Sequence, residues 1–498
     1  MFRLPAGWIS AGAQIEWRNE SLDFKPGRDT ATGAARNTTG AFSNGELRFL
    51  EYGYEALIPI FGGDFTLPLF QELELSGAYR IVDRDQETLT AGFAAAPGVT
   101  DEVYQASIRW RLTDDLVLRA NTSTSVRSAS IIELYGAPGT GFTNPAGGGI
   151  PCTPASISSA PDPAVRQANC RRAVILTGAA TDNASADAFL ANYVGVGGSR
   201  PAATAGNPFL NNEESEAVGY GFTLTPRAIP RLTIAFDYYD AEITGQVGLT
   251  GPPTTVDACF DQADFPNSQL SGTPACDQFI FGVLNTATGN YVIPTVNPLT
   301  GTPVAPVAQP GSPALVNQPF QSAFFFFPNF NLSTTKLRAA TLEARYNFAL
   351  EELFGERAAN WGDLFLSTSV YNLLQYDVVA GSVNPNAGEP GFTEWEFRTD
   401  IAHRMGRLDH RLTWFRTAGT VGNALTAPSD YPEQNITFQF PGYDLFNYTV
   451  GYQLRDNIDV RLTVNNVLNT QEVIPDIGID GVVDAVGRTY LFSITGRF

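Results

Sequence analysis

Apolar and polar residues alternate with a period of two in short segments along the whole chain. Between residues 102 and 112, for example, Tyr104, Ile108 and Trp110 fall on one face of an extended strand, and Arg109 and Arg111 fall on the other. Alternation of this kind predicts a half-buried β-strand. Fourteen such strands are expected, and they begin near residues 7, 45, 70, 102, 115, 215, 230, 334, 362, 393, 408, 443, 457 and 487.

The length of these segments favours a membrane barrel over a soluble β-sandwich. They run for about 10 to 16 residues, whereas a tilted strand needs about 9–11 residues to cross a bilayer. Sandwich strands usually have about 5–6 residues. The sequence contains no apolar run long enough for a membrane helix, which needs about 18 residues. Strands that span lipid must close into a barrel, because lipid cannot satisfy the backbone groups of an open sheet edge.

The connections between the strands alternate between short and long. Turns near residues 113–115, 226–230 and 405–407 are short, whereas the connections 127–214 and 247–333 are very long. Short periplasmic turns and long extracellular loops are typical of outer-membrane barrels. We therefore predict an all-β fold, a transmembrane antiparallel up-and-down β-barrel of about 14 strands that occupies residues 1–498 as one domain.

Composition agrees with a surface that faces lipid and excludes a nucleic-acid partner. Charged residues make up 16% of the chain, against about 25% in soluble domains. The net charge is −20, whereas phosphate binding needs a basic face. Met1 is followed at once by strand-like sequence, without the apolar segment of an export signal. We expect either a fragment of a longer gene product or a misassigned start.

The four cysteines fall in two local pairs within the two longest loops. Cys152 and Cys170 are 18 residues apart, and Cys259 and Cys276 are 17 apart. No metal-binding Cys or His spacing is present, so we expect two disulfides and an oxidising compartment. The alternative is four free thiols. The disulfides would either order the loops for ligand binding or protect them from proteolysis.

The last strand carries a strong local pattern. Tyr490, Phe492, Ile494 and Phe498 alternate with polar residues. A closing strand with outward aromatics and a terminal Phe resembles the assembly signal of outer-membrane proteins, which implies the outer-membrane assembly machinery and lipid as partners. The alternative is an ordinary amphipathic edge strand.

Several segments, in order along the chain, resemble the barrel of TonB-dependent outer-membrane receptors. The segment 118–135 is similar to a strand and loop with the core R-(A/S)-P-S-x-x-E-L, with Ala129 where the family usually has Pro. Segment 207–216 resembles NP-x-L-x-PE-x-S, and 237–243 resembles D-Y-Y-x-I-x-I. Segments 464–469 and 487–498 resemble the family's last turn and closing strand.

The resemblance implies a receptor in the Gram-negative outer membrane that takes up a scarce small-molecule ligand, such as a siderophore, cobalamin or a carbohydrate, with energy from TonB. Its barrel has 22 strands and a plugged lumen, and the present strands would be the last 14. Neither the plug domain nor the TonB box is visible here, so TonB is a partner only if a plug lies upstream. The alternative function is a passive diffusion channel or a non-functional receptor fragment.

Charged residues on the polar faces of the strands are candidates for the lumen lining. The set is Arg109, Arg111, Glu394, Glu396, Arg398, Asp459 and Arg461. These side chains would line the ligand route, or form a hydrated wall that contacts a plug. The two histidines, His403 and His410, flank a presumed periplasmic turn, and no catalytic motif is present. We predict that the chain is not an enzyme and needs no metal or cofactor.

Overall fold

A computed structural model gives the structure of the chain. The structure describes residues 2–31, 40, 42–88, 96–144, 150–195, 200–249, 251–270, 273–285, 290–292, 294–303, 320–380, 382–389, 391–422, 438–470 and 487–497.

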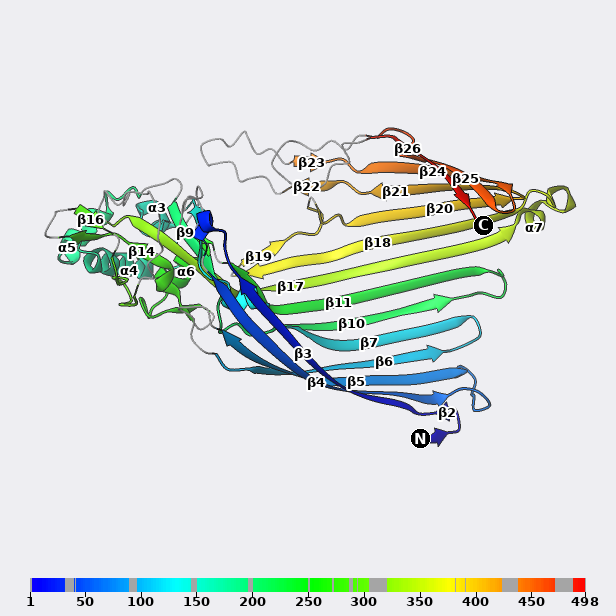
Figure 1. Cartoon of the computed structure of the whole chain (residues 1–498), viewed down its shortest axis with the longest axis horizontal. Coiled ribbons are helices and arrows are strands. Elements are labelled where there is room, and N and C mark those ends of the chain that lie inside the picture. Colours follow the sequence, from blue (N-terminus) through cyan, green and yellow to red (C-terminus); the bar gives the residue numbers. More distant parts are fainter. Residues whose placement is uncertain are drawn as a thin grey trace.

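Fourteen antiparallel strands, each paired in register with the next, form the body of the molecule (Figure 1). The alternating segments thus fold as predicted, and all but one begin within three residues of the expected position. The strands are β3 (Ser10–Phe24), β4 (Ser43–Phe61), β5 (Glu72–Thr88), β6 (Val99–Arg111), β7 (Leu116–Arg127), β10 (Glu213–Leu224), β11 (Leu232–Leu249), β17 (Ser322–Ala349), β18 (Asp363–Ala380), β20 (Trp395–Met405), β21 (Leu408–Thr417), β24 (Tyr443–Arg455), β25 (Ile458–Asn465) and β26 (Thr489–Gly496).

Short turns gather at one end of the sheet, and the two longest connections gather at the other (Figure 1). We call these the short-turn end and the loop end. The turn between β17 and β18 carries a helix, α7 (Leu350–Phe354), and a 3-10 turn, η2 (Glu356–Ala358). The smaller elements of the sheet and its connections are β1 (Arg3–Leu4), β2 (Gly7–Trp8), α1 (Arg28–Ala31), β19 (Ser382–Pro385), β22 (Thr420–Gly422) and β23 (Phe438–Phe440).

The two longest connections were expected to be loops without regular structure, but they fold into helices and short strands. The first connection contains α2 (Ile131–Tyr135), β8 (Gly139–Thr143), α3 (Pro154–Ser158), α4 (Pro163–Leu176), α5 (Asn183–Leu190) and β9 (Arg200–Ala205). The second contains α6 (Pro252–Phe260), β12 (Gln269–Leu270), β13 (Thr273–Pro274), η1 (Ala275–Gln278), β14 (Phe279–Phe281), β15 (Val283–Asn285) and β16 (Asn290–Val292). All of these elements except α2 form one body, which we call the loop lobe.

The loop lobe holds the main hydrophobic core of the molecule. Side chains from both connections meet there, including Val174 of α4, Phe260 of α6 and Phe279 of β14. Strand β17 begins twelve residues earlier than predicted because its first residues belong to this core: Phe325, Phe327 and Phe330 are buried. The core joins two segments that lie almost a hundred residues apart in the sequence.

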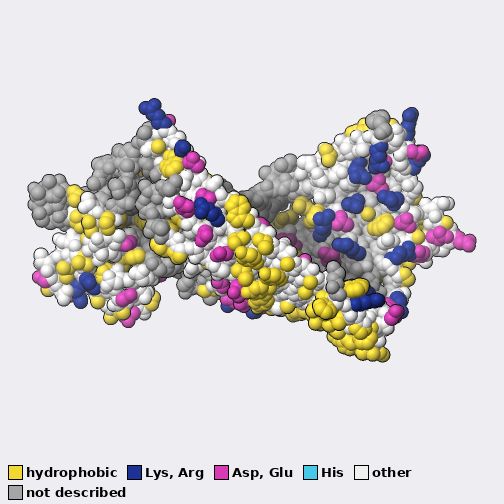
Figure 2. Space-filling view, turned by 60° about the horizontal axis from the view of Figure 1, so that its bottom comes forward, with side chains coloured by type: hydrophobic (Ala, Val, Ile, Leu, Met, Phe, Trp, Pro, Cys, Tyr) yellow, Lys and Arg dark blue, Asp and Glu magenta, His cyan; other side chains and the backbone are white. Residues whose placement is uncertain are grey.

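The strand registers give the sheet one polar and one apolar face, because side chains alternate along each strand. The row Glu16, Glu51 and Asp101 lies on the face that we call the inner face. The opposite, outer face carries apolar rows; one of them runs through Phe222, Phe236, Leu342, Val370 and Phe397. Figure 2 shows exposed apolar side chains gathered in a band and charged side chains in a hollow.

Candidate functional site: the inner face and the loop lobe

The charged residues predicted to line a lumen share the inner face wherever they lie within a strand. The registers carry the row of Arg109 through β7, β10, β11, β17 and β18 to β20, where it meets Glu396. From β20 the same face continues through β21 and β24 to Arg461. The same face also carries Arg111, Arg398 and Asp459, because each lies an even number of residues from an inner-face residue of its own strand. Glu394 precedes β20, and its carbonyl accepts hydrogen bonds from β18 instead.

Most of these inner-face charges are paired with a neighbour of opposite sign. The pairs are Arg109–Glu72 at 2.7 Å, Arg111–Glu72 at 3.0 Å, Arg398–Asp400 at 2.9 Å, Arg461–Asp409 at 3.7 Å and Asp459–Arg497 at 3.8 Å. Exposed pairs of this kind contribute about 0–1 kcal/mol each. The pairing nearly neutralises the wall and leaves a surface that water and polar solutes can wet.

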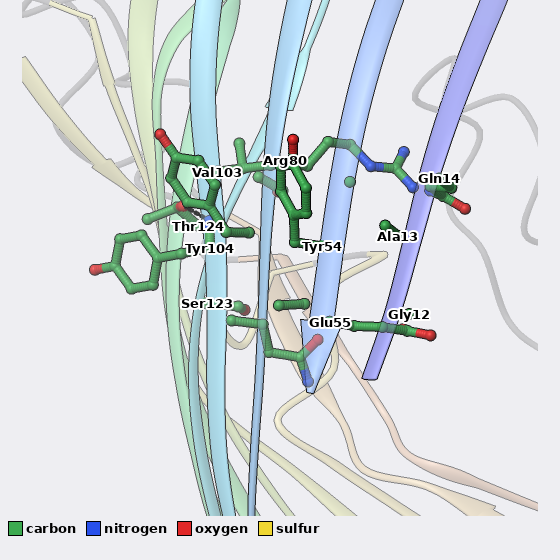
Figure 3. Close-up of a pocket in the computed structure, with 15 residues that line it drawn as sticks. Gly12, Ala13, Gln14, Tyr54, Glu55, Arg80, Val103, Tyr104, Ser123 and Thr124 are labelled. Atoms are coloured by element: carbon green, nitrogen blue, oxygen red, sulfur yellow. Dashed lines mark hydrogen bonds between the residues drawn. The ribbon is translucent and has the colours of Figure 1, made fainter. Parts of the chain in front are cut away.

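A hollow of about 560 Å³ lies on the inner face of β3 to β7. Its polar lining comes from Gln14, Glu55, Arg80, Gln105 and Ser123, and Figure 3 shows the Arg80 side chain extended toward Gln14. The lining offers both donors and acceptors of hydrogen bonds. The prediction from the sequence did not include this hollow, because its members are separated by more than a hundred residues and only the register brings them together.

Three charged residues from the family-like segments meet at the loop end of the inner face. The guanidinium of Arg127 donates to both carboxylate oxygens of Glu133 at 3.1 Å and also contacts the carboxylate of Glu213. Glu213 in turn accepts from the backbone N–H of Val247 at 2.8 Å. This α2 ion network ties β7, α2, β10 and β11 together, which gives the two sequence segments a shared structural role.

Helix α2 is held over the inner face by further hydrogen bonds. Ser130 and Glu133 form a capping box at its N-terminus. The Glu133 carbonyl accepts from Asn207 N–H at 2.8 Å and from Asn329 Nδ2 at 3.1 Å. A Cβ at Gly206 would lie 2.6 Å from backbone atoms of Leu134, so only glycine permits this approach. Both long connections therefore fasten the same short helix.

The electrostatics of α2 favour the ionised form of its acid. Burial alone raises the pKa of the Glu133 carboxyl, but hydrogen bonds from Arg127 and from Ser130 outweigh burial and hold the pKa below its usual value of 4.5. The α2 ion network is therefore intact at neutral pH.

Beneath α2 lies a charged side chain with unsatisfied hydrogen-bonding groups. Arg84 of β5 faces inward, is 0% exposed, and none of its three guanidinium nitrogens has a hydrogen-bond partner within the part of the chain that the structure describes. Asp101 acts on it only at a distance, since its carboxylate accepts from Asn212. Burying an ion without a partner costs several kcal/mol.

Disulfides join both cysteine pairs in the loop lobe. Cys152 is bonded to Cys170, Cys259 is bonded to Cys276, and all four side chains are fully buried. The bonds link the start of α3 to α4, and α6 to η1. Each disulfide thus closes a segment within one connection, and other contacts must hold the two connections to each other.

Helix α4 supplies those contacts through three polar side chains that reach the second connection. Arg166, only 3% exposed, forms an ion pair with the buried carboxylate of Asp261 and contacts the exposed Asp257 at 3.2 Å. Asn169 donates to the carbonyls of Phe260 and Gln262, each at 2.8 Å. Arg172 donates to the Phe265 carbonyl at 2.7 Å. The two connections therefore behave as one folded unit.

Aromatic contacts also hold the first connection against the second. Phe281 and Phe320 stack with ring centroids 4.5 Å apart, and Tyr193 lies edge-on to Phe320 at 5.6 Å. The hydroxyl of Tyr193 donates to the Phe320 carbonyl at 2.8 Å. Aromatic pairs contribute about 0.5–1.5 kcal/mol beyond the area that they bury.

The closing strand presents its apolar face to the outside of the sheet. Tyr490, Phe492 and Ile494 of β26 are each more than 60% exposed and lie in the row of the apolar residues of β25. Phe498 lies outside the described residues. A soluble protein rarely leaves a row of large apolar side chains this open.

The structure offers no group of residues for a metal within the described ranges, and no described helix is long and apolar enough to cross a membrane. His403 and His410 are neighbours on β20 and β21, and their rings stack with centroids 5.9 Å apart. Both lie at the short-turn end, on the outer face.

Several solved structures are similar to this one at low sequence identity. The siderophore receptor PirA from Acinetobacter baumannii is 10% identical, with 98% of this chain and 60% of that chain covered and a TM-score of 0.46. The FrpB iron transporter from Neisseria meningitidis is 12% identical, with 99% and 53% covered and a TM-score of 0.49. The copper transporter OprC is 11% identical, with 98% and 54% covered and a TM-score of 0.48. The chain spans between 53% and 60% of the length of these proteins.

A search of curated proteins finds no match to the chain. The family model described as "TonB dependent receptor-like, beta-barrel" matches residues 2–467, nearly the whole sequence. This family consists of receptors and transporters rather than enzymes. The chain therefore belongs to the TonB-dependent receptor-like β-barrel family of the Gram-negative outer membrane.

Proposed function

We propose that the chain is the barrel of an outer-membrane receptor that captures a scarce small molecule at the loop lobe and admits it along the polar inner face. The loop end is then extracellular, and the short-turn end is periplasmic. Uptake is energised by TonB where a plug domain precedes the barrel. The observation that carries the proposal is the loop lobe itself, because the described parts of the two long connections fold together into one body at one end of the sheet.

Order in the loop lobe favours binding for a physical reason. A flexible loop must lose conformational entropy when it binds, and that loss subtracts from affinity. In the loop lobe, two disulfides and the pair between Arg166 and Asp261 have already restricted the backbone. An ordered surface on a rigid sheet is the arrangement expected of a capture site.

The inner face would carry the captured molecule onward. Its charges are paired and largely neutralised, as for Arg109 with Glu72 and Arg398 with Asp400. A wall on which most of the charges are paired holds a solute of either sign less strongly than a wall of unpaired charges would. We propose Arg109, Arg111, Glu394, Glu396, Arg398, Asp459 and Arg461 as its lining.

Equilibrium binding tests the proposal. The purified chain in detergent is dialysed against ferric siderophores, cobalamin and oligosaccharides, and each variant is measured in parallel. We expect saturable binding of one class, weakened about tenfold or more by Arg166→Ala, since about 1.4 kcal/mol of extra ordering cost corresponds to a factor of ten. Arg171→Ala is the matched control, because its pair with Asp187 lies on the exposed side of the same helix.

A passive diffusion channel is the second candidate, and the hollow polar inner face favours it. The chain inserted into planar bilayers would then conduct ions without any ligand. Ion conductance together with failure of every ligand class to bind would replace the receptor proposal with the channel.

A further inference from the structure

The turn between β17 and β18 is unusual among the short turns because it carries a helix with large apolar side chains in the open. Leu353 and Phe354 of α7 are 57% and 59% exposed, and Trp361 is 49% exposed. The rings of Phe354 and Trp361 lie 5.8 Å apart. Figure 1 shows α7 projecting from the short-turn end, far from the loop lobe.

Burial at the strand ends shows which face of the sheet the turn covers. Phe348 lies on the outer face and pairs with Leu364, yet it is only 5% exposed. Phe365, the residue after Leu364, lies on the inner face and is 41% exposed. Ala358, within the turn, is also buried. The turn therefore folds back against the outer face and leaves the inner face open.

A hydrogen bond confirms that placement. His403 of β20 lies on the outer face, opposite Leu364, and its Nε2–H donates to the Trp361 carbonyl at 2.6 Å. Gly362 fixes the other end: its φ is 82°, and a Cβ there would lie 1.8 Å from the Arg404 carbonyl oxygen. The turn is thus held beside the outer face by contacts with the neighbouring strand.

We infer that the β17–β18 turn is a membrane anchor, whose Leu353, Phe354 and Trp361 insert into the lipid interface on the periplasmic side. The apolar outer face of the family's barrel is its lipid-facing wall, and the turn lies beside that wall. Aromatic side chains favour the headgroup level of a bilayer, and a short amphipathic element there buries its apolar side in lipid. In water, the same three side chains would form an apolar patch that is exposed to solvent.

The charges of the turn select the kind of lipid. Glu351 and Glu356 are exposed, as is Arg357, and Glu352 is paired with Arg231 of the neighbouring turn, so the three carboxylates outnumber the two basic side chains. Carboxylates at the interface repel anionic headgroups. The partner is therefore a leaflet of zwitterionic lipid, such as phosphatidylethanolamine.

Spin-label accessibility tests the anchor. All four native cysteines are in disulfides, so Leu353→Cys gives a single labelling site in the full chain. In vesicles of phosphatidylethanolamine and phosphatidylcholine, we expect the label to collide several-fold more with oxygen, which enters lipid, than with a water-soluble nickel complex. Asp114→Cys, in the exposed turn between β6 and β7, is the control and should show the reverse preference.

Two further variants separate anchoring from simple exposure. Phe354→Ser should reduce oxygen collisions at position 353, and His403→Ala should increase the mobility of the label, whereas His410→Ala, which leaves the Trp361 contact intact, should not. A label at position 353 that prefers the nickel complex, as at position 114, would overturn the inference. A label shielded from both reagents would also overturn it, because the turn would then pack against protein.

Discussion

Replacing Arg166 by alanine should open the loop lobe. The guanidinium is 3% exposed and its partner Asp261 is 7% exposed, so the variant leaves a buried carboxylate without a counter-charge. Removing one member of a buried pair costs about 3–5 kcal/mol. The contact with Asp257 adds little, because that side chain is 67% exposed and exposed pairs contribute about 0–1 kcal/mol.

Hydrogen exchange measures this cost where it arises. Amides of α4 and α6 should exchange about 10²- to 10⁴-fold faster in Arg166→Ala than in the parent, since each 1.4 kcal/mol is about a factor of ten. The double variant Arg166→Met with Asp261→Leu should recover most of the loss, because apolar replacements of both members avoid the unpaired charge. A change of less than about 1 kcal/mol in the single variant, or no recovery in the double variant, would refute the proposed role of this pair.

Three further predictions follow from α2, its surroundings and the β17–β18 turn. Arg84→Met should raise the free energy of unfolding in detergent by about 1–3 kcal/mol, because it removes a buried guanidinium that has no hydrogen-bond partner among the described residues; a loss of stability would show that Arg84 has a partner. The lowered pKa of Glu133 means that the α2 ion network stabilises the protein above pH 4.5 and loses that contribution as the pH falls through the folded-state pKa. Amide protection of α2 should therefore drop on acidification, and Glu133→Gln should reduce that pH dependence, with Glu213 left as the second carboxylate on Arg127; unchanged protection at low pH would contradict this. Gly362→Ala should reduce the yield of folded protein, whereas Gly355→Ala should cost about 1–3 kcal/mol, because its φ of 73° and ψ of −171° are strained but no described atom would lie within 4 Å of the added Cβ; equal yields would disprove the clash at Gly362.

The sequence was sufficient to predict the fourteen strands of the sheet apart from the first twelve residues of β17, because the predicted segments alternate and the two faces meet different surroundings. The alternation of polar and apolar residues along each strand shows in the sequence alone that Glu16 and Asp101 face one side and Phe236 faces the other. The helices of the loop lobe were missed. Signals for two of them were present: Asp162 and Pro163 begin α4, and Asp182 and Ser185 form the capping box of α5.

Other features depend on contacts between distant residues and could not be predicted from the sequence. Arg166 and Asn169 break the apolar stripe of α4 because they face the second connection, about ninety residues away. The alternation along β5 predicts that Arg84 lies on the polar face. Its burial could not be predicted, because it results from α2, which folds back onto β4 and β5. The sequence analysis assigned Phe325, Phe327 and Phe330 to a connection. They belong to the start of β17, where the strand leaves the sheet and enters the loop lobe.

Ligand uptake by cells that express the native protein would test the central claim most directly. Accumulation of the bound ligand class would be compared in cells with and without TonB, and with the loop lobe intact or carrying Arg166→Ala. An energised receptor predicts accumulation that disappears without TonB and falls in the Arg166 variant. Accumulation that persists without TonB and ignores the loop lobe would contradict the account and identify a passive channel.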